Sequence, residues 1–354
     1  MDLDKLLARR LPDPLLRSAV RLILRRKIKL QEIEDIEARQ SFVSAFAESL
    51  KKEEIAVHTN QANEQHYELP PQFFQAVLGK MLKYSCGYWP DRPDLRQAHN
   101  GLDRSEEKML ALTCRRAEVA EGQQILDLGC GWGSTAFYMA REYRGVQITA
   151  VSNAAPQIAH INREAKRLGY SNLSALKANI NDLELPQKFD RVVTVEMFEH
   201  MRNYEALLEK VAGWLKPGGK LFIHIFSHHT YPFRYENRTD GDWMARHFFT
   251  GGTMPSKDLL HYFLDHFSLE KQWALPGTHY RYTLDAWLQK MDRQRDQIYP
   301  LFIETYGAGE AEKWWNYWRV FFLSCAEFFG FRDGNEWFIS HYLLARKHGD
   351  NSPA

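Results

Sequence analysis

The sequence has few cysteines, with only four in 354 residues, at positions 86, 114, 130 and 325. They lie far apart and none forms a Cys-x-x-Cys pair, which excludes a disulfide framework and a thiolate metal cluster. We therefore expect no metal. Such sparse cysteine is typical of a reducing compartment, so we expect a cytoplasmic protein.

Long apolar runs are also missing. No window reaches the roughly 18 apolar residues of a membrane-spanning helix, and the first residues lack the apolar core of a secretory signal. The formal net charge is only +1, whereas nucleic-acid-binding domains are usually strongly basic. We expect a soluble protein, at most peripheral to a membrane, that does not bind nucleic acid.

An N-terminal helical arm is expected over residues 1–60, ahead of one domain over 61–354. Asp13 followed by Pro14 predicts an N-cap with proline at the first helical position. From there basic residues at 17, 21 and 25 line one helix face and apolar residues at 15, 16, 19, 20, 23 and 24 line another. This helix either packs on its own protein, the commoner outcome, or lies on anionic lipid headgroups. A second, charge-rich helix is predicted over 31–52.

From residue 122 onward, strand-like and helix-like segments alternate, which predicts an α/β fold with a doubly wound sheet. Lys216-Pro-Gly-Gly219 predicts a sharp turn before the fifth strand. We expect seven strands, at 124–128, 147–152, 173–178, 191–195, 220–226, 269–274 and 338–345, and helices at 135–143, 156–168, 204–215 and 256–266.

A helical insertion is expected between the sixth and seventh strands, over about 283–331. It is too long for a loop and is crowded with tryptophan and phenylalanine. Two compatible interpretations are a lid over a pocket and a hydrophobic brace on the sheet.

The most informative motif is Ile125-Leu-Asp-Leu-Gly-Cys-Gly-Trp-Gly-Ser134. An apolar run that breaks into close glycines lets the backbone approach a ligand without a Cβ in the way. Asp127, at the end of that run, can orient the loop. The spacing lacks the G-x-G-x-x-G span of a dinucleotide site and the Lys-Ser/Thr of a P-loop. It favours a nucleoside-bearing cofactor without a pyrophosphate, with close helix–strand packing as the alternative.

Polar residues follow several of the predicted strands, where open α/β sheets bind their ligands. Ser152, Asn153 and Gln157 follow the second strand, without an acid to contact a ribose. Asn179 and Ile180 follow the third, where an amide can accept from an adenine amino group and an aliphatic side chain can cover the ring. A plain surface loop is the alternative there.

The fourth strand ends in Glu196-Met-Phe-Glu-His200. Three ionisable groups in five residues are costly to bury unless they are used, because two close glutamates couple their titrations and attract a cation. His200 can carry a proton near neutral pH. A solvated turn is the alternative, which the neighbouring Met197 and Phe198 disfavour.

With these motifs, the chain resembles the cyclopropane fatty acid synthase family of class I S-adenosylmethionine (SAM) methyltransferases, and within it the branch of plant coclaurine N-methyltransferases. The resemblance covers nearly the whole length. Besides the two motifs above, it is carried by Tyr84-Ser-Cys-Gly-Tyr-Trp89, Gly251-Gly-Thr-Met-Pro-Ser256, Thr283-Leu-Asp-Ala-Trp287 and Asn316-Tyr-Trp-Arg319.

This resemblance implies a Rossmann-like fold, SAM as the cofactor and a set of site residues. It places SAM against Tyr84, Ser85, Gly129, Gly131, Gln157, Asn179 and Ile180, to which the strand-end analysis adds Asp127, Ser152 and Asn153. Asn179 stands where relatives usually have aspartate. In the cyclopropane synthases a bicarbonate ion acts as the base, and its ligands match Cys86, Glu199, His224 and Tyr280, all present here. Those synthases typically have glycine at the position of Glu196, whereas the alkaloid N-methyltransferases have glutamate.

The two possible acceptors make opposite demands on the site. An amine needs a carboxylate to orient its N–H and a nearby group to accept its proton, whereas a carboxylate beside an acyl chain is costly to desolvate. We therefore assign catalysis to Glu196, Glu199 and His200 and expect N-methylation of a hydrophobic, aromatic amine, with the aromatic insertion forming cation–π contacts to the product.

The alternative is a cyclopropane synthase or carbon methyltransferase that acts on membrane phospholipid. A SAM-binding scaffold without catalysis is a third hypothesis, which the intact acidic cluster disfavours. The sequence leaves a homodimer open.

Overall fold

The computed structural model describes residues 3–57, 69–239 and 242–347. Its centre is a seven-stranded sheet in the order β3-β2-β1-β4-β5-β9-β8, in which β9 runs antiparallel to both neighbours and the other pairs are parallel. The expected fold class is confirmed. The strands are β1 (Gln124–Leu128), β2 (Gln147–Ser152), β3 (Leu173–Lys177), β4 (Phe189–Val195), β5 (Leu215–His228), β8 (Phe267–Leu275) and β9 (Trp337–Arg346).

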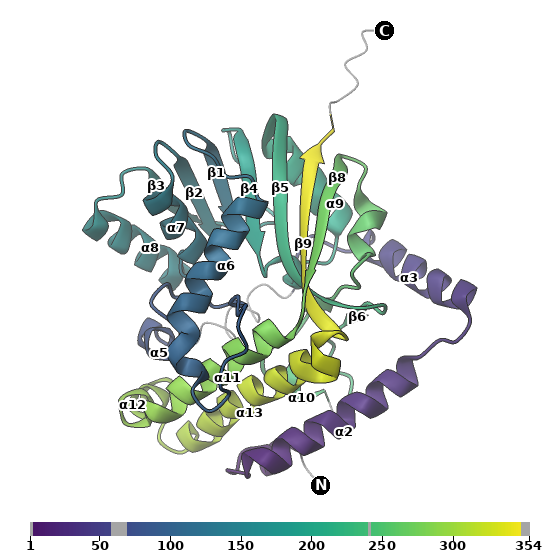
Figure 1. Cartoon of the computed structure of the whole chain (residues 1–354), viewed down its shortest axis with the longest axis vertical. Helices are drawn as coiled ribbons and strands as arrows, with labels where there is room; N and C mark the ends of the chain where they lie inside the picture. The colour runs from purple at the N-terminus through teal and green to yellow at the C-terminus, as the bar shows by residue number, and fades with distance from the viewer. Residues whose placement is uncertain (1–2, 58–68, 240–241, 348–354) are drawn as a thin grey trace.

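Helices cover both faces of the sheet because its strands are apolar on both sides. Ile125 belongs to one buried cluster, with α6 (Leu102–Arg116), α7 (Ser134–Glu142) and α8 (Ala155–Leu168). The next residue, Leu126, points to the other cluster, with α3 (Ile36–Leu50), α9 (Tyr204–Trp214) and the 3₁₀ turn η3 (Leu259–Phe263). The result is a three-layered α/β/α body (Figure 1).

A helical cap lies at the end of the sheet where the parallel strands have their carboxyl ends (Figure 1). It consists of α11 (Thr278–Arg293), α12 (Arg295–Tyr306) and α13 (Ala311–Gly330), with α2 (Asp13–Gln31) and α5 (Pro71–Val77) packed against them. Smaller elements complete the chain: α1 (Leu3–Leu7), η1 (Ala98–Gly101), η2 (Phe198–His200), β6 (Phe233–Arg234), α10 (Trp243–His247), β7 (Thr253–Met254) and η4 (Phe331–Gly334).

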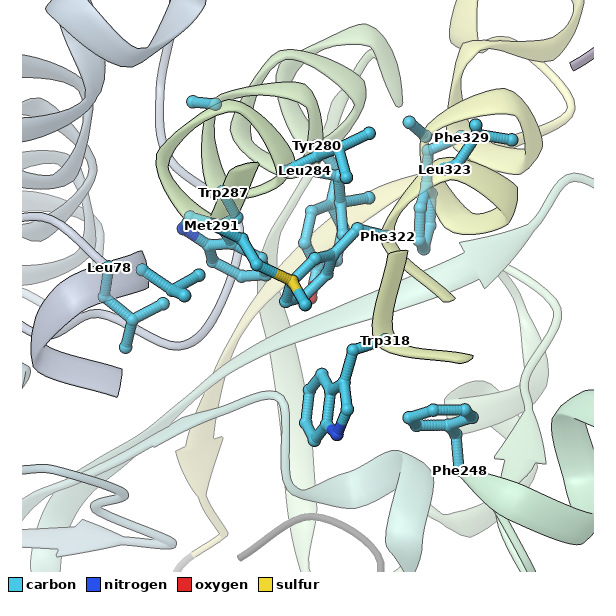
Figure 2. Close-up of a cluster of buried hydrophobic side chains, with 14 of the residues drawn as sticks. Leu78, Phe248, Tyr280, Leu284, Trp287, Met291, Trp318, Phe322, Leu323 and Phe329 are labelled. Carbon is cyan, nitrogen blue, oxygen red and sulfur yellow. The ribbon is translucent and has the colours of Figure 1, made fainter. Parts of the chain in front are cut away.

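Aromatic side chains form the interior of the cap (Figure 2). Trp287, Trp315 and Trp318 are each no more than 1% exposed. Tyr280 stacks on Phe329 with ring centroids 4.5 Å apart. These rings pack the helices of the insertion against one another.

Several expected boundaries were wrong. The insertion begins at 278 rather than 283, so it includes Tyr280. The helix predicted over 256–266 is only the short turn η3. The helix expected over 31–52 is the shorter α3, Ile36–Leu50, because α2 continues to Gln31 and the chain turns between the two helices. β5 starts at 215, since Leu215 already pairs with Phe189 before residues 216–219 bulge out of register. The boundary expected at 60/61 lies outside the described residues.

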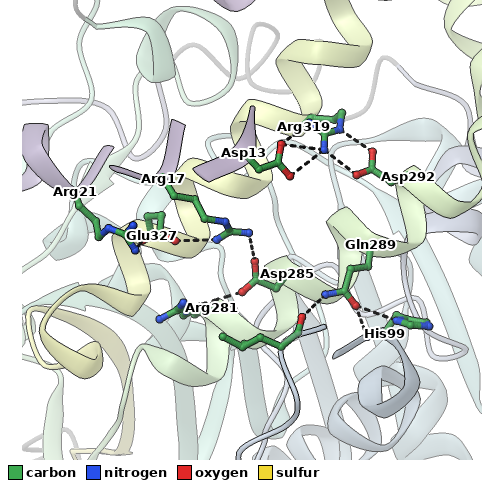
Figure 3. Close-up of polar contacts among 11 residues, drawn as sticks. Asp13, Arg17, Arg21, His99, Arg281, Asp285, Gln289, Asp292, Arg319 and Glu327 are labelled. Atoms are coloured by element: carbon green, nitrogen blue, oxygen red, sulfur yellow. Dashed lines mark hydrogen bonds and ion pairs between the residues drawn. The ribbon is translucent and has the colours of Figure 1, made fainter. Parts of the chain in front are cut away.

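The arm packs on the cap through charged side chains (Figure 3). The carboxylate of Asp13, expected as an N-cap, instead pairs with Arg319, because Pro12 takes the cap position. Arg17 lies 2.6 Å from Asp285 and 2.8 Å from Glu327, and Arg21 lies 3.1 Å from Glu327. Both acidic side chains are at most 5% exposed. Arg17 and Arg21 of the predicted basic face therefore contact their own protein, whereas Arg25 is exposed.

The apolar face of α2 also differs from expectation. Leu16 and Leu24 are buried, but Leu15 and Ile23 are 66% and 63% exposed, because the ion pairs turn this side of the helix outward. In the described part of the chain, no helix combines the length and the apolar character that crossing a membrane requires.

We predict that Arg17→Met lowers the free energy of unfolding by about 2–3 kcal/mol, because two buried carboxylates each lose their shorter ion pair and keep only Arg281 at 3.7 Å and Arg21 at 3.1 Å. Urea denaturation measures this. Arg25→Met on the exposed part of the same helix is the matched control and should change stability by less than about 0.5 kcal/mol. Equal effects of the two substitutions would contradict the anchoring role.

Candidate functional site

A pocket opens at the carboxyl edge of the sheet. Nine of the predicted site residues line it, and they come from the ends of β1, β2, β3 and β4 or from the turn after each. These nine are Gly129, Gly131, Ser152, Asn153, Gln157, Asn179, Ile180, Glu196 and His200.

The glycine loop after β1 forms one wall of this pocket. Gly129 and Gly131 have φ values of +81° and +53°, in the left-handed region that favours glycine. A Cβ on Gly131 would meet no atom within 4 Å, so it would project into open space, whereas one on Gly129 would collide with the Met197 side chain at 2.6 Å. Gly131 is therefore the position at which the backbone can approach a ligand.

Asp127 lies behind this loop rather than in the lining of the pocket. It is 1% exposed and accepts a hydrogen bond from the backbone N–H of Ala136 at the start of α7. Burial raises the pKa of its carboxyl to about 7. Asp127 thus ties the loop to the following helix, as its predicted orienting role requires.

Gln157, in the first turn of α8, offers an unused donor to the pocket. Its Oε1 accepts from the Ser152 hydroxyl at 2.8 Å. Its buried Nε2 has no hydrogen-bond partner among the described residues. An orphaned buried amide in a pocket wall fits a polar acceptor on a bound cofactor. The residues present therefore fit SAM, whose carboxylate and ribose oxygens are such acceptors.

The predicted adenine contact has the expected location. Asn179 and Ile180 line the pocket beyond β3, beside the apolar Ala178 and Leu183. Asn179 Oδ1 also accepts from the backbone N–H of Asn181 at 3.1 Å, which sets the direction of the amide. Leu183 was missed by sequence reasoning because it lies in a turn several residues after the strand.

Glu196 lines the pocket and is also the centre of a cluster of polar side chains. Its Oε1 accepts from the backbone N–H of Cys86 at 2.9 Å and lies 3.2 Å from His224 Nε2. Its Oε2 accepts from the Tyr280 hydroxyl at 2.6 Å. Burial raises the pKa of that hydroxyl, and the negative charge of Glu196 raises it further, so Tyr280 keeps its proton and donates.

The backbone of Glu196 is itself strained. Its φ is +50°, a conformation that costs a residue with a side chain roughly 1 kcal/mol or more. The backbone N–H donates to the carbonyl of His224 at 2.8 Å, which holds the turn in place. Such strain is tolerated where the side chain must occupy one particular place.

The two glutamates of the cluster differ in environment. Burial raises the pKa of both. Lys83 and the surrounding donors oppose this at Glu196, whereas neither carboxyl oxygen of Glu199 has a hydrogen-bond partner in the described part of the chain. Glu199 also lies close to Glu196, whose charge raises its pKa further. Glu196 is therefore the member that stays ionised, and Glu199 holds the proton.

His200 shares the lining of the pocket with Glu196 and contacts Phe249, with ring centroids 4.8 Å apart and ring planes tilted by 57°. Burial lowers the pKa of its imidazole to about 4, although the charge of Glu196 acts in the opposite direction. The ring is neutral at physiological pH and can accept a proton.

The remaining predicted residues lie beside the pocket. Ser85 accepts a hydrogen bond from Lys83, a side chain only 1% exposed that sequence reasoning missed. Tyr84 packs against Phe74 and Trp287, with ring centroids 5.3 and 5.4 Å away. Lys83 had no detectable signal in the sequence, because a lysine is normally exposed.

No group of three His, Cys, Asp or Glu side chains suited to a metal occurs among the described residues.

Comparisons with known proteins agree with this geometry. A family model described as mycolic acid cyclopropane synthetase matches residues 55–337. The (S)-coclaurine N-methyltransferase of Thalictrum flavum subsp. glaucum is 35% identical over 95% of this chain and 92% of its own length. The cyclopropane-fatty-acyl-phospholipid synthase of Escherichia coli K12 is 29% identical over 77% of this chain and 65% of its own.

A solved structure, coclaurine N-methyltransferase bound to N-methylheliamine and SAH, has a TM-score of 0.90 and 34% identity to this chain. The match covers 95% of this chain and 96% of that one.

We predict that Gly131→Ala weakens SAM binding by roughly tenfold or more, because its methyl group enters the space beside the glycine loop. Isothermal titration calorimetry measures the dissociation constant. Gly122→Ala is the matched control, since Gly122 also has a positive φ of +73° and open space around it but lies outside the pocket lining. Both variants should lose about 1 kcal/mol of stability. SAM affinity that is equal in both would refute the loop assignment.

Proposed function

The chain belongs to the mycolic acid cyclopropane synthetase family of SAM-dependent methyltransferases, and we propose that it methylates the nitrogen of a hydrophobic, aromatic amine. The relatives that are named N-methyltransferases match over almost the full length of the chain, including the arm and the cap. The cofactor site has the parts that SAM requires, and the acidic cluster lies at its lower end.

The observation that carries the proposal is the position of the Glu196 carboxylate. Cys86, His224 and Tyr280, which match bicarbonate ligands of the cyclopropane synthases, all direct a polar group at it. The side chain of Glu196 thereby occupies the set of donors that would otherwise hold the anion. An anion fixed to the chain by a covalent bond suits a substrate that becomes a cation during the reaction.

The residues of the cluster can orient an amine for attack. When bound, SAM supplies an electrophilic methyl group on its sulfonium, and the sulfur takes the electron pair of the broken C–S bond. The amine nitrogen uses its lone pair to form the new N–C bond. Its N–H is directed toward the Glu196 carboxylate, which stabilises the positive charge that forms on nitrogen.

The proton of the resulting ammonium needs an acceptor. His200 is neutral and lines the same pocket, so it takes the proton from nitrogen. Glu199 keeps its own proton, because burial and the lack of a hydrogen-bond partner at both of its oxygens in the described part of the chain disfavour the ionised form. The aromatic rings nearest to this cluster are Tyr280 and Phe249, which are placed to contact the cation through their faces.

The first experiment is mass spectrometry of the products formed from purified protein, SAM and two acceptor pools, small aromatic amines and unsaturated phospholipids. We expect a gain of about 14 mass units, one methyl group, on an amine. The same gain on an acyl chain would overturn the proposal and assign the protein to lipid modification.

We predict that Glu196→Gln lowers kcat roughly 100-fold and changes SAM affinity by less than about threefold, because it removes the charge that faces the acceptor. His200→Ala should have the same pattern. Glu106→Gln is the matched control, since Glu106 is another buried carboxylate that accepts two backbone N–H bonds away from the pocket lining. An equal loss of SAM affinity and turnover in Glu196→Gln would contradict its role.

Glu196→Gly gives a sharper version of the same test. Glycine accepts the positive φ of this position, and the variant leaves the three donors around a vacant space of carboxylate size. Added formate or bicarbonate should restore part of the lost activity, and chloride at equal ionic strength should not. Equal recovery with all three salts would mean that the donors do not hold the carboxylate as proposed.

A further inference from the structure

A buried row of side chains leads away from Glu196 along the face of the sheet that α6 covers. His224 on β5 and His341 on β9 face each other across the strand pair. His341 Nε2 lies 2.9 Å from His224 Nδ1, and Arg116 Nη1 lies 2.9 Å from His341 Nδ1. The row Arg116–His341–His224–Glu196 is therefore continuous, and both imidazoles are fully buried.

Arg116 fixes the direction in which each hydrogen bond of this row is donated. A guanidinium can only donate, so His341 Nδ1 accepts and, in a neutral ring, His341 Nε2 carries the hydrogen. That hydrogen points at His224 Nδ1, which leaves the hydrogen of His224 on Nε2, directed at Glu196. Burial lowers the pKa of both imidazoles well below the usual value, and the charges of Lys83 and Arg116 lower it further. Both rings are neutral, as this assignment requires.

The row cannot carry a proton out of the site. Its last member, Arg116, does not give up a proton and has no acceptor to offer. Its guanidinium also lies over the ring of Trp273, 4.7 Å from the centroid, which holds it at the far end. The row therefore does not relay protons, and its effect is on the orientation and the protonation state of the Glu196 side chain.

We propose that Arg116 and His341 are positioning residues that lock His224 as a hydrogen-bond donor and so keep the Glu196 carboxylate ionised and aimed at the acceptor. This inference rests on the proposed function of Glu196. The other groups that face this carboxylate are Lys83, Cys86, Tyr280, His200 and Glu199. Without the row, His224 can place its hydrogen on Nδ1 and present a lone pair to the carboxylate, which favours protonation of Glu196.

Nuclear magnetic resonance of the ligand-free protein tests the row without an acceptor. Histidine labelled with ¹⁵N should show both His224 and His341 as the Nε2–H form. Glutamate labelled with ¹³C at the carboxyl should show the titration of Glu196, identified by its loss in Glu196→Gln. His341→Leu should raise the pKa of Glu196 by roughly 1–2 units, the effect of one hydrogen bond to a carboxylate. An unchanged titration, or Nδ1–H at His224 in the unmutated protein, would overturn the proposal.

Kinetics then show whether the row serves the reaction. His341→Leu should lower kcat roughly tenfold at unchanged KM for SAM, and the acidic limb of its pH profile should move to higher pH. The acceptor must be an amine of low basicity, so that the amine does not itself titrate within the pH range over which kcat is measured. His341→Gln should recover most of the activity, because its amide can donate to His224 and accept from Arg116.

Three further variants guard against a loss of folding. Arg116 is only partly buried, so Arg116→Met should fold and reproduce the shift, while Arg116→Lys, still an obligate donor, should not. Leu343→Val removes a methylene from the same face of β9 two residues on and should leave the pH profile unchanged. A shift in Leu343→Val equal to that in His341→Leu would refute the positioning role. If the histidines show the predicted Nε2–H forms but the protein methylates no amine, the proposed function is contradicted. The hydrogen-bonded row from Arg116 to Glu196 would still be supported.

Discussion

The site depends on one buried interaction, the contact of the Glu196 carboxylate with three donors that come from distant parts of the chain. The backbone of Cys86 precedes the sheet, His224 lies in β5, and Tyr280 comes from the first helix of the cap. A carboxylate without such partners would take up a proton or destabilise the fold. The three segments must therefore meet at this point before Glu196 can be both buried and charged, and the strained backbone at φ +50° is compensated by these contacts.

This arrangement gives different environments to Glu196 and Glu199, which lie only three residues apart in the sequence. Glu199 is fully buried and the side chain of Glu196 is only 9% exposed, so burial raises the pKa of both. The difference arises from partners: Glu196 has them, and Glu199 has none among the described residues. Partners therefore favour the ionised form at Glu196, whereas burial without partners favours the protonated form at Glu199. A single pair of like residues acquires two roles from environment alone.

The sequence was sufficient for the sheet, the glycine loop and the acidic cluster, because each has a local signal. The runs at 124–128 and 147–152 were predicted with their observed bounds. It was insufficient for Asp13, whose acid-proline pair is typical of a cap but whose carboxylate is used by Arg319, a residue more than 300 positions away. Lys83, Arg116 and His341 share this limitation. Their partners are set by strand pairing and helix packing, so no spacing in the sequence indicates that they meet.

The arm and the catalytic cluster are joined through one helix. Tyr280 and Asp285 both belong to α11, about one and a half turns apart. Tyr280 donates to Glu196, and Asp285 accepts from Arg17 of the arm. Because a helix turn is stiff over this length, the ion pair that seats the arm also limits how far the Tyr280 hydroxyl can move from the carboxylate. Anchoring of the arm on the cap and alignment of Tyr280 at the site are therefore parts of the same mechanical constraint, and the pairing of Arg17 with the buried Asp285 is the contact that joins them.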